Sequence, residues 1–149
     1  MFLIWFVVWW IIGLLYIDWK RWRIGYPTAL AGSLGSFFID TASVSGGFWS
    51  YPDPLLSGLW PNILLNFSIY PVGSWIFVQK LPEDRLRQVL WIIGGAIVLL
   101  VVEFHLGSQG RMSYHNGWNI GWSALANLFL LSLLVVHYRK AERGHPSYS

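Results

Sequence analysis

Residues 89–103 read VLWIIGGAIVLLVVE, a run of fourteen uncharged residues that ends at Glu103. A helix of that length rises about 21 Å at 1.5 Å per residue, which is short of a hydrocarbon core about 30 Å thick. The sequence therefore predicts a membrane-spanning helix over 88–105, in which Glu103 and His105 lie at or just inside the interface to complete the span.

The composition of the whole chain agrees with this local pattern. Of the 149 residues, 55% are hydrophobic and 11% are charged, and the mean hydropathy is +0.49. Soluble domains carry about 25% charged residues, so the composition indicates an integral membrane protein. A net charge of +3 is too small to suggest a nucleic-acid partner, and the lack of cysteine excludes disulfides and thiolate metal sites.

Four further apolar segments predict an all-α, polytopic bundle of five transmembrane helices in a single domain over 1–140. Pro27 is expected in the first turn of the second helix, and Asp40 at its end. Pro71 is expected to kink the third helix, because its ring removes the hydrogen bond to the Phe67 carbonyl. The first segment is interpreted as a retained helix, since its charges follow the apolar run. The expected spans are 2–17, 24–40, 59–78, 88–105 and 118–138, with a short cytoplasmic tail over 141–149.

The positive charges predict the orientation. Arg111 is one of ten Lys and Arg residues, and the other nine fall in alternate connections of the predicted bundle or in its tail. The positive-inside rule places those connections in the cytoplasm, which gives an outside N-terminus, an inside C-terminus and a multi-pass protein of the cell membrane.

Polar residues recur every four positions in three of the predicted helices, and therefore lie on one face of each. These faces are expected to meet one another or an enclosed polar space, because lipid cannot satisfy an amide. One interpretation is hydrogen bonding between helices, and the alternative is a pathway for a solute, with the Phe67 carbonyl facing it. The second helix contributes Thr28, Gly32, Ser36 and Asp40, and the polar seam of the bundle comprises Asn62, Asn66, Tyr70, Ser123 and Asn127.

Ionisable residues of both signs gather at the predicted outer ends of the helices. Three interpretations stay open: solvated charges, a pair between Arg111 and a carboxylate, or a divalent metal such as Zn²⁺ or Mn²⁺. The spacing matches no metal motif, so we expect no cofactor. Glu103 is expected to have Arg111 or His115 as its partner, because a carboxylate beside hydrocarbon is costly. The candidate cluster comprises Asp40, Glu103, His105, Arg111, His115 and Asn119.

The long outer connection, 41–58, contains Phe48, Trp49 and Tyr51 but no Lys or Arg. We expect these rings to anchor the loop at the membrane interface, where aromatic residues are enriched. The alternative is a lid folded over the bundle.

Several short motifs lie between residues 30 and 140: Asp40, the aromatic loop, Ile69-Tyr70-Pro71, Leu81-Pro82, Glu103, and Trp118-Asn119 with Ser123. In these motifs the chain resembles a family of uncharacterised small multispanning membrane proteins of spore-forming Gram-positive bacteria. The resemblance implies a location in the bacterial cytoplasmic membrane, but no biochemical activity to carry over.

The sequence predicts a non-enzymatic binding or structural membrane subunit. It contains none of the nucleophile, zinc or phosphate-loop motifs that would indicate an enzyme, although a membrane enzyme remains a third alternative. The main alternative is an oligomeric channel or transporter for an ion or a small solute. The expected partners are membrane lipids, further copies of the chain or other membrane subunits.

Overall fold

A computed structural model describes residues 1–56 and 58–143, and it is built almost entirely of helices, which confirms the predicted all-α class. A two-stranded antiparallel ribbon, in which Trp49 pairs with Tyr114 and Ser50 with Ser113, is the departure from that class. The elements are α1 (Phe2–Tyr16), the 3₁₀ turn η1 (Trp19–Arg21), α2 (Trp22–Ser45), β1 (Trp49–Ser50), α3 (Trp60–Asn66), α4 (Ile69–Gln79), α5 (Arg85–Ser108), β2 (Ser113–Tyr114) and α6 (Ile120–Arg143).

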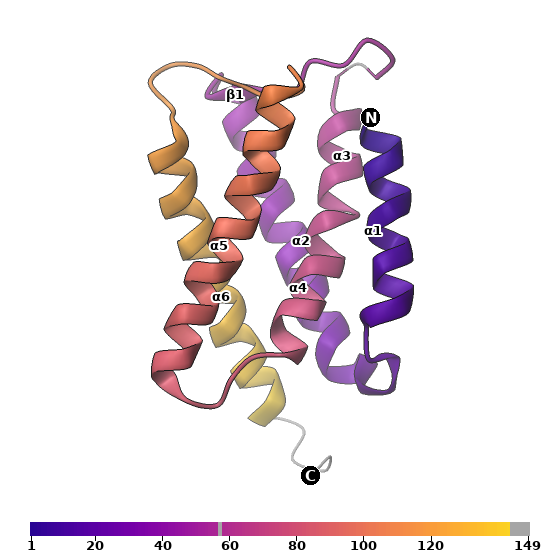
Figure 1. Ribbon diagram of the computed structural model, residues 1–149, viewed down its shortest axis with the longest axis vertical. Coiled ribbons are helices and arrows are strands. Elements are labelled where there is room, and N and C mark those ends of the chain that lie inside the picture. The colour runs from indigo at the N-terminus through magenta and orange to yellow at the C-terminus, as the bar shows by residue number, and fades with distance from the viewer. Residues whose placement is uncertain (57, 144–149) are drawn as a thin grey trace.

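The helices run up and down the long axis of the molecule, and the N-terminus and the end of α6 lie at opposite ends (Figure 1). α2 is central and packs against α3, α4 and α6. α1 covers α3 and α4 on one side, whereas α5 packs mainly on α6 at the other. We call the end that carries β1 and β2 the ribbon end.

Two of the described helices, α5 and α6, are long and apolar enough to cross a membrane. The count rises to three if α1 and the segment Trp19–Ser45, which meet at a bend of 90°, form one broken span. α5 is more exposed than α6: 11% of an apolar stretch of 18 residues in α5 is buried, against 28% in α6. These lengths and compositions are compatible with a membrane protein.

Several helix boundaries differ from the expected ones. α2 begins at Trp22, so Pro27 lies in its second turn rather than its first. α2 also continues beyond Asp40 to Ser45, because the Asp40 side chain turns inward and finds hydrogen-bond donors there instead of ending the helix in solvent. α6 extends to Arg143, so the expected tail over 141–149 begins as helix, and residues 144–149 lie outside the described part of the chain.

The segment predicted as the third span forms two helices, α3 and α4, rather than one helix kinked at Pro71, and Pro71 falls in the first turn of α4. Proline is tolerated there because its missing N–H would have no partner within α4. The Phe67 carbonyl accepts a hydrogen bond from Trp10 Nε1 at 3.0 Å. This carbonyl, which the pathway alternative left free of the helix, is therefore bonded to α1.

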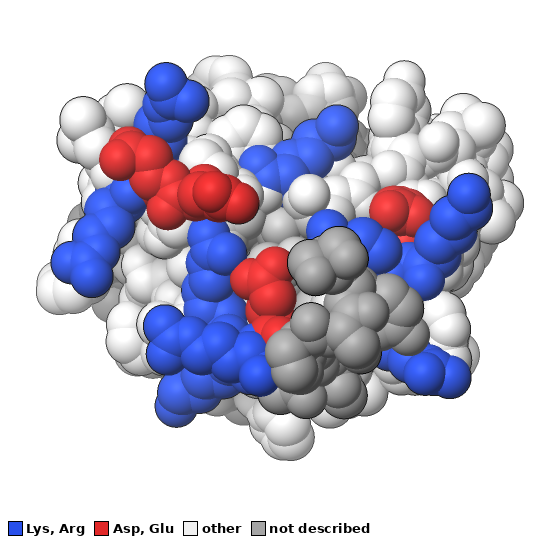
Figure 2. Space-filling view, turned by 90° about the horizontal axis from the view of Figure 1, so that it is seen from below, with Lys and Arg blue, Asp and Glu red and all other residues white. Residues whose placement is uncertain are grey.

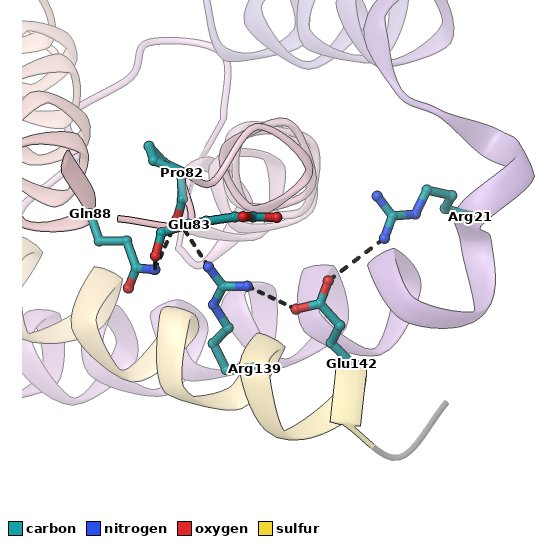
Figure 3. Close-up of polar contacts among 6 residues, drawn as sticks. All are labelled: Arg21, Pro82, Glu83, Gln88, Arg139 and Glu142. Carbon is teal, nitrogen blue, oxygen red and sulfur yellow. Dashed lines mark hydrogen bonds and ion pairs between the residues drawn. The ribbon is translucent and has the colours of Figure 1, made fainter. Parts of the chain in front are cut away.

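The opposite end of the molecule is basic, with Lys and Arg side chains gathered around a few Asp and Glu (Figure 2). There Arg139 donates to Glu142 at 2.9 Å and to the Pro82 carbonyl at 3.0 Å, and Arg21 lies 3.8 Å from Glu142 (Figure 3). Gln88 also donates to the Pro82 carbonyl. These contacts join η1, the loop before α5 and the end of α6, and we call this the basic end.

Candidate functional site

Asp40 is the centre of the first half of the candidate site. Its side chain points into the bundle from α2, and the residue is 4% exposed. Oδ1 accepts hydrogen bonds from Trp49 Nε1 and the Tyr51 hydroxyl, both at 2.8 Å, and Oδ2 accepts one from Asn66 Nδ2 at 2.7 Å. An indole N–H can only donate, so Oδ1 of Asp40 acts as an acceptor.

Asn66 connects Asp40 to a wider polar network and is fully buried. Its amide nitrogen also donates to the Asn62 backbone and side-chain oxygens, and its side-chain oxygen accepts from Ser36. Ser33 donates to the Asn66 carbonyl. The four-residue spacing thus places Ser36 and Asp40 of α2 opposite Asn62 and Asn66 of α3, where each finds a partner. Ser33 lies outside that spacing and reaches the same interface.

Glu103 is the centre of the second half of the site. It lies in the penultimate turn of α5 and accepts the Tyr114 hydroxyl at 2.6 Å and Asn127 Nδ2 at 2.8 Å. Ser123 lies one turn before Asn127 on the same face of α6. Its hydroxyl donates to the Tyr114 hydroxyl at 3.3 Å and accepts from Trp118 Nε1 at 2.9 Å. Asn127 and Ser123 are buried, so α6 contributes the floor of this half.

The ribbon connects the two halves of the site at the ribbon end of the bundle. β1 brings Trp49, with Tyr51 just after it, to Asp40, and β2 brings Tyr114 to Glu103. Trp49 is 7% exposed, and its ring packs edge-on against Trp118 with the centroids 5.0 Å apart. Trp49 and Tyr51 therefore cover the bundle, as in the lid alternative, so the expectation that both rings serve as interfacial anchors is wrong; Phe48 stays 40% exposed.

A cavity of about 50 Å³ lies between the two halves. Both carboxylates line it, together with four aromatic rings from three parts of the chain. No Lys, Arg or His is present in its lining, as far as the described residues go. Its chemistry is therefore that of a small, acidic, aromatic-walled space. The lining is Ser36, Ile39, Asp40, Trp49, Tyr51, Tyr70, Glu103, Met112, Trp118, Ser123, Ala126, Asn127 and Leu130.

The two loop tyrosines act as hydrogen-bond donors in this arrangement. Burial, with the charge of Asp40 adding to it, raises the pKa of Tyr51 well above its usual value of 10. Burial, and then the hydrogen bond to Glu103, likewise raises the pKa of Tyr114. Both hydroxyls keep their protons at neutral pH, so each can donate to the carboxylate beside it.

The other members of the predicted cluster lie outside the cavity. Arg111 pairs with Asp53 at 3.4 Å, so the expected pair between Arg111 and Glu103 is not formed. His115 is exposed and contacts the Ser50 hydroxyl at 2.9 Å, and it too is not the partner of Glu103. Both expectations failed because the ribbon turns Tyr114, rather than its neighbours, toward α5.

His105 and Asn119 have local roles. His105 is exposed and its ring lies 5.6 Å from that of Trp5. Asn119 precedes α6 and accepts from the backbone N–H groups of Gly121 and Trp122, as a helix cap does, and it does not line the cavity. Among residues 1–56 and 58–143, no group of three or more His, Cys, Asp or Glu is arranged to hold a metal ion.

The aromatic members of the site were absent from the predicted cluster. Trp49, Tyr51 and Tyr114 lie in connections, where no helical spacing relates them to Asp40 or Glu103. Their polar groups could have indicated these contacts, because a buried indole N–H or phenol needs a hydrogen-bond acceptor. The nearest candidate acceptors are the carboxylates at helix ends.

Comparisons of the chain with models of protein families, with curated proteins and with solved structures found no match. The site is therefore interpreted from its own chemistry.

Proposed function

We propose that this chain is a multispanning membrane protein that binds a small cationic group, an ammonium ion or a primary amine, between Asp40 and Glu103. The observation that carries the proposal is that two carboxylates from different helices line one cavity whose described lining contains no cationic side chain. Buried carboxylates are usually paired with an opposite charge, because removing them from water is costly. A bound cation would supply that charge.

The walls of the cavity also suit a cation. Trp49, Tyr51, Tyr70 and Trp118 line it, and aromatic faces attract ammonium groups, most strongly where water is excluded. The neutral donors around each carboxylate spread its negative charge without neutralising it. A volume of about 50 Å³ exceeds the roughly 30 Å³ share of one water molecule, so the cavity suits one compact group.

We propose five spans, with the site on the outer side of the membrane. Nine of the ten Lys and Arg residues in alternate connections support an outside ribbon end, as does the basic character of the opposite end. The resemblance of the motifs to the family of Gram-positive membrane proteins is consistent with this arrangement. An impermeant maleimide should label Ser108→Cys but not Glu83→Cys in intact cells, and the reverse pattern would overturn the orientation.

We favour binding over transport and over catalysis. An apolar cluster that includes Phe77, Leu131 and Leu134 lies between the cavity and the basic end, which favours binding over a continuous polar pathway. The cavity lining offers carboxylates and neutral donors, which suits holding a ligand rather than attacking one.

Thermal unfolding of the purified protein tests the proposal. Methylammonium chloride should raise the melting temperature of the wild type above its value in equal choline chloride, whose head group is bulkier. At ten times the dissociation constant, a ligand that binds the folded state alone stabilises it by about 1.4 kcal/mol. Asp40→Asn and Glu103→Gln should each abolish the shift.

Asp53→Asn is the matched control, because Asp53 pairs with Arg111 outside the cavity. It should keep the methylammonium shift of the wild type. An equal shift in wild type, Asp40→Asn and Glu103→Gln would mean that the cation binds elsewhere, and the proposal would be rejected. If Asp40→Asn does not fold, Glu103→Gln decides alone.

A further inference from the structure

A second, larger space lies beside the carboxylate cavity. It is a groove of about 420 Å³ between α4, α5 and α6, closed on one side by Trp9 of α1. This volume is within the range of roughly 300–1,000 Å³ that is typical of ligand sites. The groove exists because α5 packs on α6 and stands away from α4, and because Gly73, Gly94 and Gly95 contribute no side chains to its walls.

The lining of the groove is suited to hydrocarbon. It consists of aliphatic and aromatic side chains, with Ser74 and the phenol of Tyr70 as its polar members. Along α5 it runs from Trp91 to Val102, about 17 Å at 1.5 Å per residue. Toward the basic end, Trp91 stacks on Phe77 with the ring centroids 6.0 Å apart and donates to the Phe77 carbonyl at 3.0 Å, so this end of the groove has a fixed wall.

The groove and the carboxylate cavity are neighbours. Tyr70 and Leu130 line both, and Val102, the last groove residue on α5, directly precedes Glu103. A ligand in contact with both spaces would have an apolar part beside α5 and a polar part at the carboxylates. The ribbon covers the cavity at the ribbon end. The groove faces outward between helices whose exposed surface is apolar, as Val98 of its lining shows, which is 57% exposed.

We propose that the cavity and the groove form one site for a long-chain primary amine of the bilayer, with its ammonium head between Asp40 and Glu103 and its single hydrocarbon chain in the groove. This inference rests on the proposed function, to which it adds the identity of the ligand's second half. Charge complementarity selects the head: the two carboxylates attract an ammonium and repel the phosphate or carboxylate of a common anionic lipid. The outward-facing groove provides entry from the membrane.

Two amines that differ in chain length test the inference with the full-length protein in phosphatidylcholine nanodiscs. The readout is the concentration of dodecylammonium or methylammonium that gives half of the maximal thermal stabilisation. For the wild type, dodecylammonium should act at a concentration at least tenfold lower, whereas dodecanoate should give no shift that depends on Glu103.

Gly94→Phe is the informative variant, because no described atom outside its own helix turn lies within 4 Å of a Cβ built at Gly94. Its ring should fill the groove without straining the core, and should reduce the advantage of the long chain at least fivefold while leaving the methylammonium response unchanged. Gly94→Ala controls for the loss of glycine, and Ile97→Phe adds a ring to a 54% exposed position outside the groove lining. Both controls should behave as the wild type, and the comparison within one bilayer cancels simple partitioning.

The outcomes separate the two proposals. If methylammonium stabilises the protein through Asp40 and Glu103 but the long-chain advantage is equal in wild type and Gly94→Phe, the chain lies elsewhere and this inference is overturned, while the proposed function stands. If neither amine gives a shift that depends on the carboxylates, both proposals are rejected.

Discussion

The hydrogen bond from Trp10 to the Phe67 carbonyl offers a direct test of how the break between α3 and α4 is stabilised. Pro71 cannot donate to that carbonyl, and Trp10 Nε1 does so at 3.0 Å. Phe67 is 41% exposed, and in a lipid environment no water would replace the lost donor. Trp10→Phe should therefore lower the free energy of unfolding through an unsatisfied carbonyl.

The expected magnitude follows from hydrogen bonds measured in membrane proteins, which contribute about 0.6 kcal/mol on average and up to about 1.7 kcal/mol. We expect Trp10→Phe to cost about 1 kcal/mol more than Trp9→Phe. Trp9→Phe is the control, because it removes the same atoms from an indole that donates no hydrogen bond within the described chain. It therefore measures the loss of packing alone. Equilibrium unfolding in mixed micelles of dodecylmaltoside and dodecyl sulfate is the assay.

Pro71→Ala completes the test. Alanine restores a backbone N–H one helical turn after Phe67, so the carbonyl gains an alternative donor. Trp10→Phe should then cost less in the Pro71→Ala background than in the wild type, and the difference is the coupling energy of a double-mutant cycle. Equal costs in both backgrounds, or equal costs for Trp10→Phe and Trp9→Phe, would refute this account of the break.

Two further predictions concern packing and pH. A Cβ at Gly32 would lie 3.2 Å from Leu134 Cδ1 and still closer to α4, so Gly32→Leu should lower the free energy of unfolding by about 1–3 kcal/mol. A Cβ at Gly35 would meet its nearest neighbour at 3.7 Å, so Gly35→Leu should cost much less in the same unfolding assay. The backbone N–H of Leu55 holds the pKa of Asp53 below its usual 3.8, so Asp53 contributes stability above that value and loses it as the pH falls through the lower, folded-state pKa. Melting temperatures measured downward from pH 5 should therefore fall less steeply for Asp53→Asn than for the wild type, and parallel curves would contradict the assignment.

The sequence predicted the helical segments well because their signal is local. Hydrophobic runs of helical length, with proline near Phe67, are enough to locate the helices and the interruption between α3 and α4. The four-residue spacing also predicted that Gly32 lies at a close helix contact, and the structure places it against α4 and α6. Boundaries were less certain, as Asp40 shows, since a polar residue ends a helix only if the interior offers it no partner.

The sequence by itself therefore determined the apolar character of the chain, its helical class and the faces that carry polar side chains, because composition and periodicity depend on neighbours along the chain. The tertiary structure decided the partners. Whether Glu103 would bond Arg111, His115 or Tyr114 depended on the register of a two-stranded ribbon between loops more than sixty residues apart, and such a register has no local signature. The cavity and the groove likewise exist only because α5 packs on α6 and stands away from α4.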